Sequence, residues 1–245
     1  MVILRADNIS KQYDGKTIIR DINIELRKGE LVSLLGISGS GKTTLFHVLA
    51  GLTMPEKGHV FLEEEDITGK PGKIAYMLQK DMLLAHKKVI DNVSLPLVLR
   101  GKSKREARLA ADPYFEEFGL AGTQYQYPVQ LSGGMRQRAA LLRTWLASEG
   151  VALLDEPFSA LDSITKTTIH RWYLDVMKKI NLSTLFITHD IDEAILLSDR
   201  IYILTGSPGI IKDEILLPPK DQRPEAYNLT EEFLGIKKEI LSRMG

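Results

Sequence analysis

Apolar and polar residues alternate along the first part of the chain, in two stretches separated by one turn. Residues 2–13 and 16–27 both have this period of two and carry many β-branched side chains. The pair Asp14-Gly15 between them is typical of a two-residue hairpin turn. We therefore expect an antiparallel β subdomain at the N-terminus.

Short apolar runs and helical patterns then follow one another in two later parts of the chain. The apolar runs predict strands at residues 31–35, 59–62, 73–78, 150–154, 184–188, 201–204 and 210–216. Helical spacing predicts helices from about residue 45 and at about residues 163–180, 191–197 and 230–243. Strands that alternate with helices indicate an α/β fold whose mostly parallel sheet is covered on both faces.

Between about residues 82 and 147 the pattern is helical throughout. Residues 102–118 are strongly amphipathic and predict one helix, with Ser103 as N-cap and Glu106 completing a capping box. In the preceding segment we expect Pro96 to mark a kink or a boundary. We expect a helical subdomain inserted into the core.

The expected organisation is one domain with three parts. They are an α/β core of residues 1–81 and 150–217, a helical subdomain of residues 82–149, and a C-terminal tail helix within residues 218–245.

Composition removes several classes of function. The 245 residues carry 32 Lys and Arg against 32 Asp and Glu, so the zero net charge gives no broad electrostatic footprint for nucleic acid. The absence of cysteine excludes disulfides and thiolate metal sites. The N-terminus lacks a signal-peptide pattern, and no stretch of about 18 apolar residues occurs. If the protein works at a membrane, we expect another chain to hold it there.

One glycine-rich segment carries the strongest chemical signal. Residues 36–44 fit the pattern G-x-x-x-x-G-K-[ST], between a predicted strand and a predicted helix. Glycines let backbone N–H groups approach an anion closely, and the helix start adds free N–H groups and a positive dipole end. We expect Lys42 to reach the β- and γ-phosphates of a nucleoside triphosphate and Thr43 to ligate Mg²⁺. A glycine-rich turn without a ligand is the weaker alternative.

Polar residues follow several of the predicted parallel strands. Gln79, the pair Asp155-Glu156 and His189 each come directly after one, as the glycine-rich segment does. Ligands of such sheets lie at the carboxyl ends of strands, so we expect these residues on one rim. Asp155 is a candidate for holding Mg²⁺ through water, and Glu156 is a candidate general base for an attacking water.

A second pair of adjacent glycines stands at the start of a predicted helix. The segment Leu131-Ser132-Gly133-Gly134-Met135 forms a second candidate anion-binding helix terminus. Such a terminus has no evident use in a nucleotide site that is already built. We expect it to face the γ-phosphate bound by another copy of the chain.

These motifs, in this order, resemble those of the ATP-binding subunits of ABC transporters over almost the whole chain. In that family, segment 36–44 is similar to the Walker A loop, Gln79 to the Q-loop glutamine, segment 131–135 to the signature motif and segment 151–156 to Walker B. Further similarities are the D-loop at 159–162, the switch histidine at His189 and the adenine-stacking aromatic at Tyr13. Met135 replaces the usual glutamine of the signature. Within the family, the chain resembles bacterial importers of the nitrate, sulfonate, taurine and aminopyrimidine group.

The resemblance implies a P-loop NTPase core, ATP and Mg²⁺ as cofactors, and a role for each motif residue. The implied catalytic residues are Glu156, His189, Lys42 and Gln79. The implied ATP contacts within one chain are Tyr13, Gly36, Ile37, Ser38, Gly39, Ser40, Gly41, Lys42, Thr43 and Thr44. The contacts implied from a second chain are Ser132, Gly133, Gly134, Met135 and Asp162, and the implied metal-binding residues are Thr43, Gln79 and Asp155.

The resemblance also implies partners and a location. We expect a second copy of the chain, membrane permease subunits that contact residues 82–88 (from Met82 to Lys88), and an extracytoplasmic substrate-binding protein, with the chain at the cytoplasmic face of the membrane. No nucleic-acid partner is expected. The alternatives are a related ATPase that acts without a membrane partner, in regulation or on nucleic acid, and an exporter ATPase. The transported substrate is not encoded in this chain.

Overall fold

The computed structural model describes residues 1–159, 163–224 and 226–244, and it begins with an antiparallel sheet. In this part of the chain the sheet has the order β2-β1-β4-β5, from β1 (Val2–Tyr13), β2 (Lys16–Arg27), β4 (Lys57–Leu62) and β5 (Glu65–Asp66). The predicted hairpin is confirmed: Tyr13 pairs with Lys16 across Asp14 and Gly15, whose φ angles are 50° and 76°. Two positive φ angles are what a tight hairpin turn requires.

A second sheet forms the centre of the molecule. Within the described residues its order is β10-β9-β3-β8-β7-β6. Its strands are β3 (Leu31–Gly36), β6 (Ala75–Met77), β7 (Val151–Asp155), β8 (Ser183–Thr188), β9 (Arg200–Thr205) and β10 (Ile210–Leu216). Neighbours are parallel except for β9 and β10, so the expected mostly parallel sheet is confirmed. All residues of β3, β7 and β8 are buried, which explains their continuous apolar sequences.

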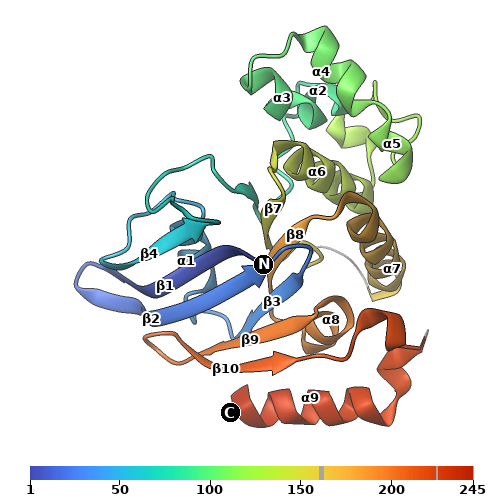
Figure 1. Cartoon of the computed structure of the whole chain (residues 1–245). Coiled ribbons are helices and arrows are strands. Elements are labelled where there is room, and N and C mark those ends of the chain that lie inside the picture. The colour runs from blue at the N-terminus through green and yellow to red at the C-terminus, as the bar shows by residue number, and fades with distance from the viewer. Residues whose placement is uncertain (160–162, 225, 245) are drawn as a thin grey trace.

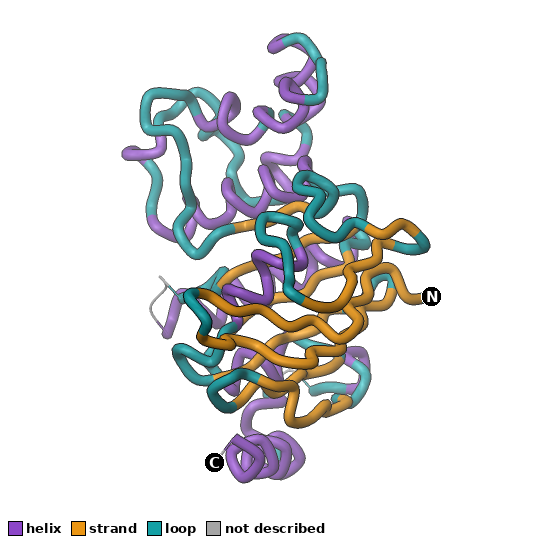
Figure 2. Tube along the Cα trace, turned by 90° about the vertical axis from the view of Figure 1, so that its left-hand side faces the viewer, coloured by secondary structure: helices purple, strands orange, loops and turns teal. Residues whose placement is uncertain are grey.

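Helices cover this second sheet and extend to the C-terminus. They are α1 (Lys42–Leu49), α7 (Ser163–Ile180), α8 (Ile191–Leu197) and α9 (Glu231–Met244), with 3₁₀ turns at Lys220–Gln222 and Tyr227–Leu229. Helix α1 contacts β1, β2 and β7, and Phe46 and Leu49 of this helix belong to the apolar cluster that joins the two sheets. Helix α9 packs on α8 and β9 at the far end of the molecule from the helical lobe (Figures 1 and 2).

The remaining helices form a separate lobe above the sheets in Figure 1. They are α2 (Val89–Val93), α3 (Leu95–Leu99), α4 (Lys104–Ala111), α5 (Tyr114–Glu117) and α6 (Gly133–Ala147), with a 3₁₀ turn at Pro128–Gln130. Ser103 and Glu106 form the expected capping box, with Ser103 N–H donating to Glu106 Oε2 over 2.9 Å. Pro96 lies in the first turn of α3 and so marks a boundary.

The prediction of one helix over residues 102–118 is wrong. The structure has two helices, α4 and α5, separated by Asp112 and Pro113. Proline has no N–H to donate to the carbonyl four residues earlier, so the helical hydrogen-bond ladder is interrupted there.

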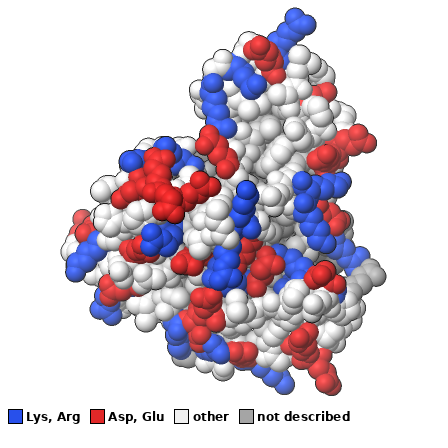
Figure 3. All heavy atoms as spheres, viewed as in Figure 1, with Lys and Arg blue, Asp and Glu red and all other residues white. Residues whose placement is uncertain are grey.

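Two surface features bear on function. Acidic and basic side chains are interspersed over the face seen in Figure 3, in keeping with the zero net charge. Of the helices in the described residues, none combines the length and the apolar character that crossing a bilayer requires.

Candidate active site

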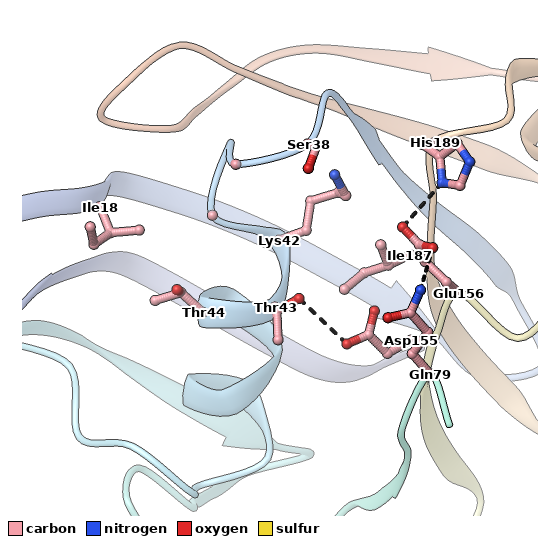
Figure 4. Close-up of a pocket in the computed structure, with 12 residues that line it drawn as sticks. Ile18, Ser38, Lys42, Thr43, Thr44, Gln79, Asp155, Glu156, Ile187 and His189 are labelled. Atoms are coloured by element: carbon pink, nitrogen blue, oxygen red, sulfur yellow. Dashed lines mark hydrogen bonds and ion pairs between the residues drawn. The ribbon is translucent and has the colours of Figure 1, made fainter. Parts of the chain in front are cut away.

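A cavity of about 600 Å³ lies where the central parallel strands end. Its walls come from the glycine-rich loop between β3 and α1 and from the residues that follow β6, β7 and β8 (Figure 4). The expected rim is therefore present: Lys42, Gln79, Asp155, Glu156 and His189 all line one space. The volume falls within the range of small-molecule sites.

The glycine-rich loop has a backbone that side chains would disturb. Gly39 and Gly41 have φ angles of 82° and 97°, and Gly41 is the N-cap residue that directly precedes α1. A Cβ atom at Gly41 would lie 2.5 Å from Ile19 Cγ2, and one at Gly36 would lie 2.5 Å from the Leu204 carbonyl oxygen. Close packing therefore requires glycine at both positions, and at Gly41 the backbone conformation requires it as well.

Lys42 crosses this loop from the first turn of α1. Its Nζ donates to the carbonyl oxygens of Gly36 and Ile37, each over 2.8 Å, and the residue is only 7% exposed. Burial lowers the pKa of Lys42, while the carboxylates of Glu156 and Asp155 oppose this effect. A buried ammonium satisfied by neutral carbonyls is a strong attractor for an anion in the cavity.

Beside the loop, two side chains offer oxygen ligands of the kind that Mg²⁺ takes. Thr43 Oγ1 lies 3.4 Å from Asp155 Oδ2, across the base of the cavity (Figure 4). Asp155 is 7% exposed, and burial raises the pKa of its carboxyl. Hydrogen bonds from Tyr76 and Thr43 lower that pKa, and Glu156 raises it. A cation would relieve the cost of burying this carboxylate.

Glu156 is held by two of the other expected residues. Gln79 Nε2 donates to Glu156 Oε2 over 2.9 Å, and His189 Nδ1 lies 3.1 Å from Oε1. Its backbone N–H donates to the Ile187 carbonyl, and its φ of 45° is unusual for a residue other than glycine. Strain of this kind is often found at functional residues, and here it accompanies a carboxylate held from two sides.

The signature segment does not reach this cavity within one chain. In the described residues, the lining of the cavity includes none of residues 132–135. Ser132 caps α6, with its Oγ accepting from Met135 N–H, and Gly133 borders a second hollow of about 770 Å³ shared with Glu156 and His189. Ser132 and Gly133 are both exposed, so the N-terminus of α6 is accessible at the surface beside this hollow.

The other expected residues have different surroundings. Tyr13 ends β1 and is 44% exposed, with Lys11 Nζ lying 5.1 Å from the centre of its ring. Ser38 and Thr44 line the cavity, and Ser40 donates its hydroxyl proton to the Ile37 carbonyl. Asp162 lies outside the described residues.

Sequence reasoning missed Ile18, Ile187 and Tyr76. The first two line the cavity, and the Tyr76 hydroxyl lies 3.2 Å from Asp155 Oδ2. One signal was available for Tyr76, since it is a tyrosine within the apolar run that leads to Gln79.

Comparison with known proteins identifies the family. The profile described as ABC transporter matches residues 19–159. The formylaminopyrimidine import ATP-binding protein ThiZ of Halalkalibacterium halodurans is 41% identical over 97% of this chain and 94% of its own length. The chain belongs to the ABC transporter ATP-binding family. The nitrate import ATP-binding protein NrtD of Synechocystis is 35% identical to this ABC protein, over 98% of this chain and 94% of its own length.

A solved structure agrees with this membership. It is the dimeric structure of a post-hydrolysis state of the ATP-binding cassette MJ0796 bound to ADP and Pi, and it matches with a TM-score of 0.75. The match has 27% sequence identity over 88% of this chain and 99% of that one. The family resemblance and the fold class are both confirmed. The chain is an ATPase, with ATP as its nucleotide and Mg²⁺ as its metal.

The donor set of the cavity fits both ligands. The buried Lys42 ammonium and the N-terminus of α1 are suited to phosphates, and Thr43 and Asp155 carry oxygen atoms of the kind that Mg²⁺ takes.

Proposed function

We propose that this ABC ATPase powers the import of a solute through a separate membrane permease. The relatives named above, which match nearly the full length of the chain, are import ATP-binding proteins. The observation that carries the proposal is the cavity itself, in which Lys42, the Thr43–Asp155 pair and the held carboxylate of Glu156 lie together. Charge for phosphate, ligands for metal and a base for water are the parts that phosphoryl transfer needs.

For the hydrolytic step, we propose that Glu156 is the general base. The attacking water loses a proton to the Glu156 carboxylate as its oxygen bonds to the γ-phosphorus, and the bond from phosphorus to the bridging oxygen breaks. Gln79 and His189 hold the carboxylate oxygens in place before the water arrives. Lys42 turns from the carbonyls of Gly36 and Ile37 to the β- and γ-phosphates.

The metal and the remaining loop residues complete the site. Bound Mg²⁺ supplies positive charge that stabilises the charge on the phosphate oxygens. Thr43 and Asp155 would hold the metal ion, and Gln79, which lines the same cavity, would be a further ligand. Backbone N–H groups of residues 36–44 would hold the phosphates, and the exposed ring of Tyr13 would stack on adenine.

Two copies of the chain are proposed to share each ATP. The exposed start of α6 would contact the γ-phosphate held by the other copy, together with Asp162; its residues are Ser132, Gly133, Gly134 and Met135. The matched MJ0796 cassette is itself a dimer, which supports this arrangement. The positive end of the α6 dipole is suited to an anion.

The permease is proposed to contact residues 82–88. These residues begin the helical subdomain (82–149), which is inserted between the two parts of the core, residues 1–81 and 150–217. Met82 is 56% exposed with a φ of 47°, and Ala85 and His86 are also exposed. Leu83 instead packs against the apolar core. The segment follows Gln79, so nucleotide and permease would act on one stretch of chain. The ATPase would then lie at the cytoplasmic face of the membrane, in a system with an extracytoplasmic substrate-binding protein.

Cross-linking tests this assignment. The chain has no native cysteine, so Ala85→Cys gives a single thiol at an exposed position. We expect a cross-link to a polytopic membrane protein in native membranes, and none from the control Lys238→Cys on α9, far from the lobe. Failure of Ala85→Cys and neighbouring cysteine variants along 82–88 to cross-link, with ATP binding intact, would refute the permease contact.

A further inference from the structure

Tyr76 reaches the metal-binding carboxylate from the strand that leads to Gln79. Its hydroxyl donates to Asp155 Oδ2 over 3.2 Å, and the same oxygen faces Thr43 Oγ1 at 3.4 Å. One carboxylate oxygen of Asp155 is therefore the acceptor for two hydroxyl groups from different elements, β6 and α1.

The ring of Tyr76 is fixed where it stands. It packs edge-on against Phe46 at 6.1 Å and His47 at 5.9 Å between ring centres, both on α1. Parallel pairing of β6 with β7 sets Tyr76 opposite Leu153, two residues before Asp155. Contacts with α1 and strand pairing with β7 therefore fix the position of the ring, so the hydroxyl stays close to Asp155.

The hydroxyl groups of Thr43 and Tyr76 would have different partners once Mg²⁺ is bound. Thr43 is the residue expected to ligate the metal, so its hydroxyl would direct a lone pair to the cation. Tyr76 is not part of the cavity lining, and it can keep its bond to Asp155. A phenol hydroxyl donates one proton, and here the acceptor is Asp155 Oδ2.

We propose that Tyr76 is a positioning residue for Mg²⁺: its hydroxyl holds one oxygen of Asp155 and thereby orients the carboxylate toward the metal. Groups that hold a metal ligand from behind fix its orientation, and their loss typically weakens metal binding about 10- to 100-fold. The inference rests on the proposed ATP–Mg²⁺ site, and it is independent of the permease and of import.

The test removes one atom. Tyr76→Phe keeps the ring and its packing on Phe46 and His47 and deletes only the hydroxyl. The matched control is Tyr114→Phe, which deletes the hydroxyl from a ring that packs on Trp145 in the helical lobe. Both are made in the Glu156→Gln background so that nucleotide is not consumed. Binding of the fluorescent analogue TNP-ATP is measured in EDTA and in saturating MgCl₂.

We expect Tyr76→Phe to change the affinity for TNP-ATP in MgCl₂ but not in EDTA. In EDTA, Tyr76→Phe should bind the analogue as the Glu156→Gln parent does, because the phosphate loop is untouched. The strengthening of binding by Mg²⁺ should fall about tenfold, at the low end of the effect of losing such a supporting group. Tyr114→Phe should match the parent in both conditions.

Three results would overturn the inference. An unchanged Mg²⁺ effect in Tyr76→Phe means that the hydroxyl does not orient Asp155. Equal weakening with and without Mg²⁺ means that Tyr76 supports the whole site structurally. If Mg²⁺ has no effect on the parent while the analogue still binds, the metal is not held at Thr43 and Asp155, and the metal part of the proposed function fails with the inference.

Discussion

The sharpest test of the proposed chemistry is the pair of hydrogen bonds to Glu156. His189→Ala removes the partner of Oε1, and Gln79→Ala removes the partner of Oε2. Neither side chain contributes a phosphate ligand of the glycine-rich loop, so nucleotide binding should remain. Both substitutions lose the orientation of the carboxylate that takes the proton from water, and because Gln79→Ala also removes a proposed Mg²⁺ ligand, the assay is run at saturating MgCl₂.

The magnitude follows from the contacts. A hydrogen bond to a charged group contributes about 1.5–3 kcal/mol, and about 1.4 kcal/mol corresponds to a tenfold change in rate. The His189 side chain is 59% exposed, so water can take part of its place and the lower figure applies. We expect each single substitution to lower kcat at least about tenfold. Glu156→Gln should have the lowest kcat of these variants, since a positioned base contributes about 10²–10⁴-fold to the rate.

The assay is steady-state ATP hydrolysis by the four members of a double-mutant cycle, with KM and kcat measured separately. Because both residues hold one carboxylate, their effects should be non-additive, and His189→Ala with Gln79→Ala should approach Glu156→Gln without passing below it. Three outcomes would refute the reasoning: full additivity, a change confined to KM, or turnover by Glu156→Gln at the wild-type rate.

Two further predictions concern the second copy and the fold. A Ser132→Arg chain should bind ATP but not hydrolyse it. Mixing it with a Lys42→Ala chain should restore part of the ATPase activity, because one of the two interfaces then has an intact glycine-rich loop and an intact signature segment. If activity does not recover at any mixing ratio, the two copies do not share their ATP sites. Arg200→Met should lower the free energy of unfolding by about 3–5 kcal/mol in chemical denaturation, because it removes the cation from a nearly buried bidentate pair with Glu30 and from its second pair with Glu214. The control Arg5→Met breaks a half-exposed pair with Asp7 and should cost less than about 1 kcal/mol, and equal losses in the two variants would contradict this assignment.

Local signals in the sequence were sufficient for most of the elements. The turn Asp14-Gly15 set the hairpin, and a helical pattern between Asp190 and Ser198 gave the bounds of α8. The prediction was wrong over residues 102–118 because amphipathic spacing continues through Pro113, although proline lacks the N–H that a continuous helix needs there. The capping box at Ser103 was correct because it depends on four consecutive residues alone.

The rim of the site was predictable for a different reason. Parallel strands end on one edge, so Gln79, Glu156 and His189 could be placed together without knowledge of strand order. Their mutual hydrogen bonds could not be predicted, because these depend on the order β8-β7-β6 and on the φ of 45° at Glu156. Nor could spacing alone show that Ser132 is exposed and does not line the cavity, because this depends on how α6 packs against the core.

The contact between Tyr76 and Asp155 could not be predicted from sequence motifs. This contact joins residues 79 positions apart, and it exists because β6 pairs with β7 in one register and α1 holds the ring from the side. A shift of one residue in that register would turn the hydroxyl to the opposite face of the sheet. Motif residues therefore supply the reacting and binding groups, whereas the strand register decides which neighbouring side chains orient them. A homologous cassette with phenylalanine at this position would keep every motif and, by this reasoning, hold Mg²⁺ less firmly.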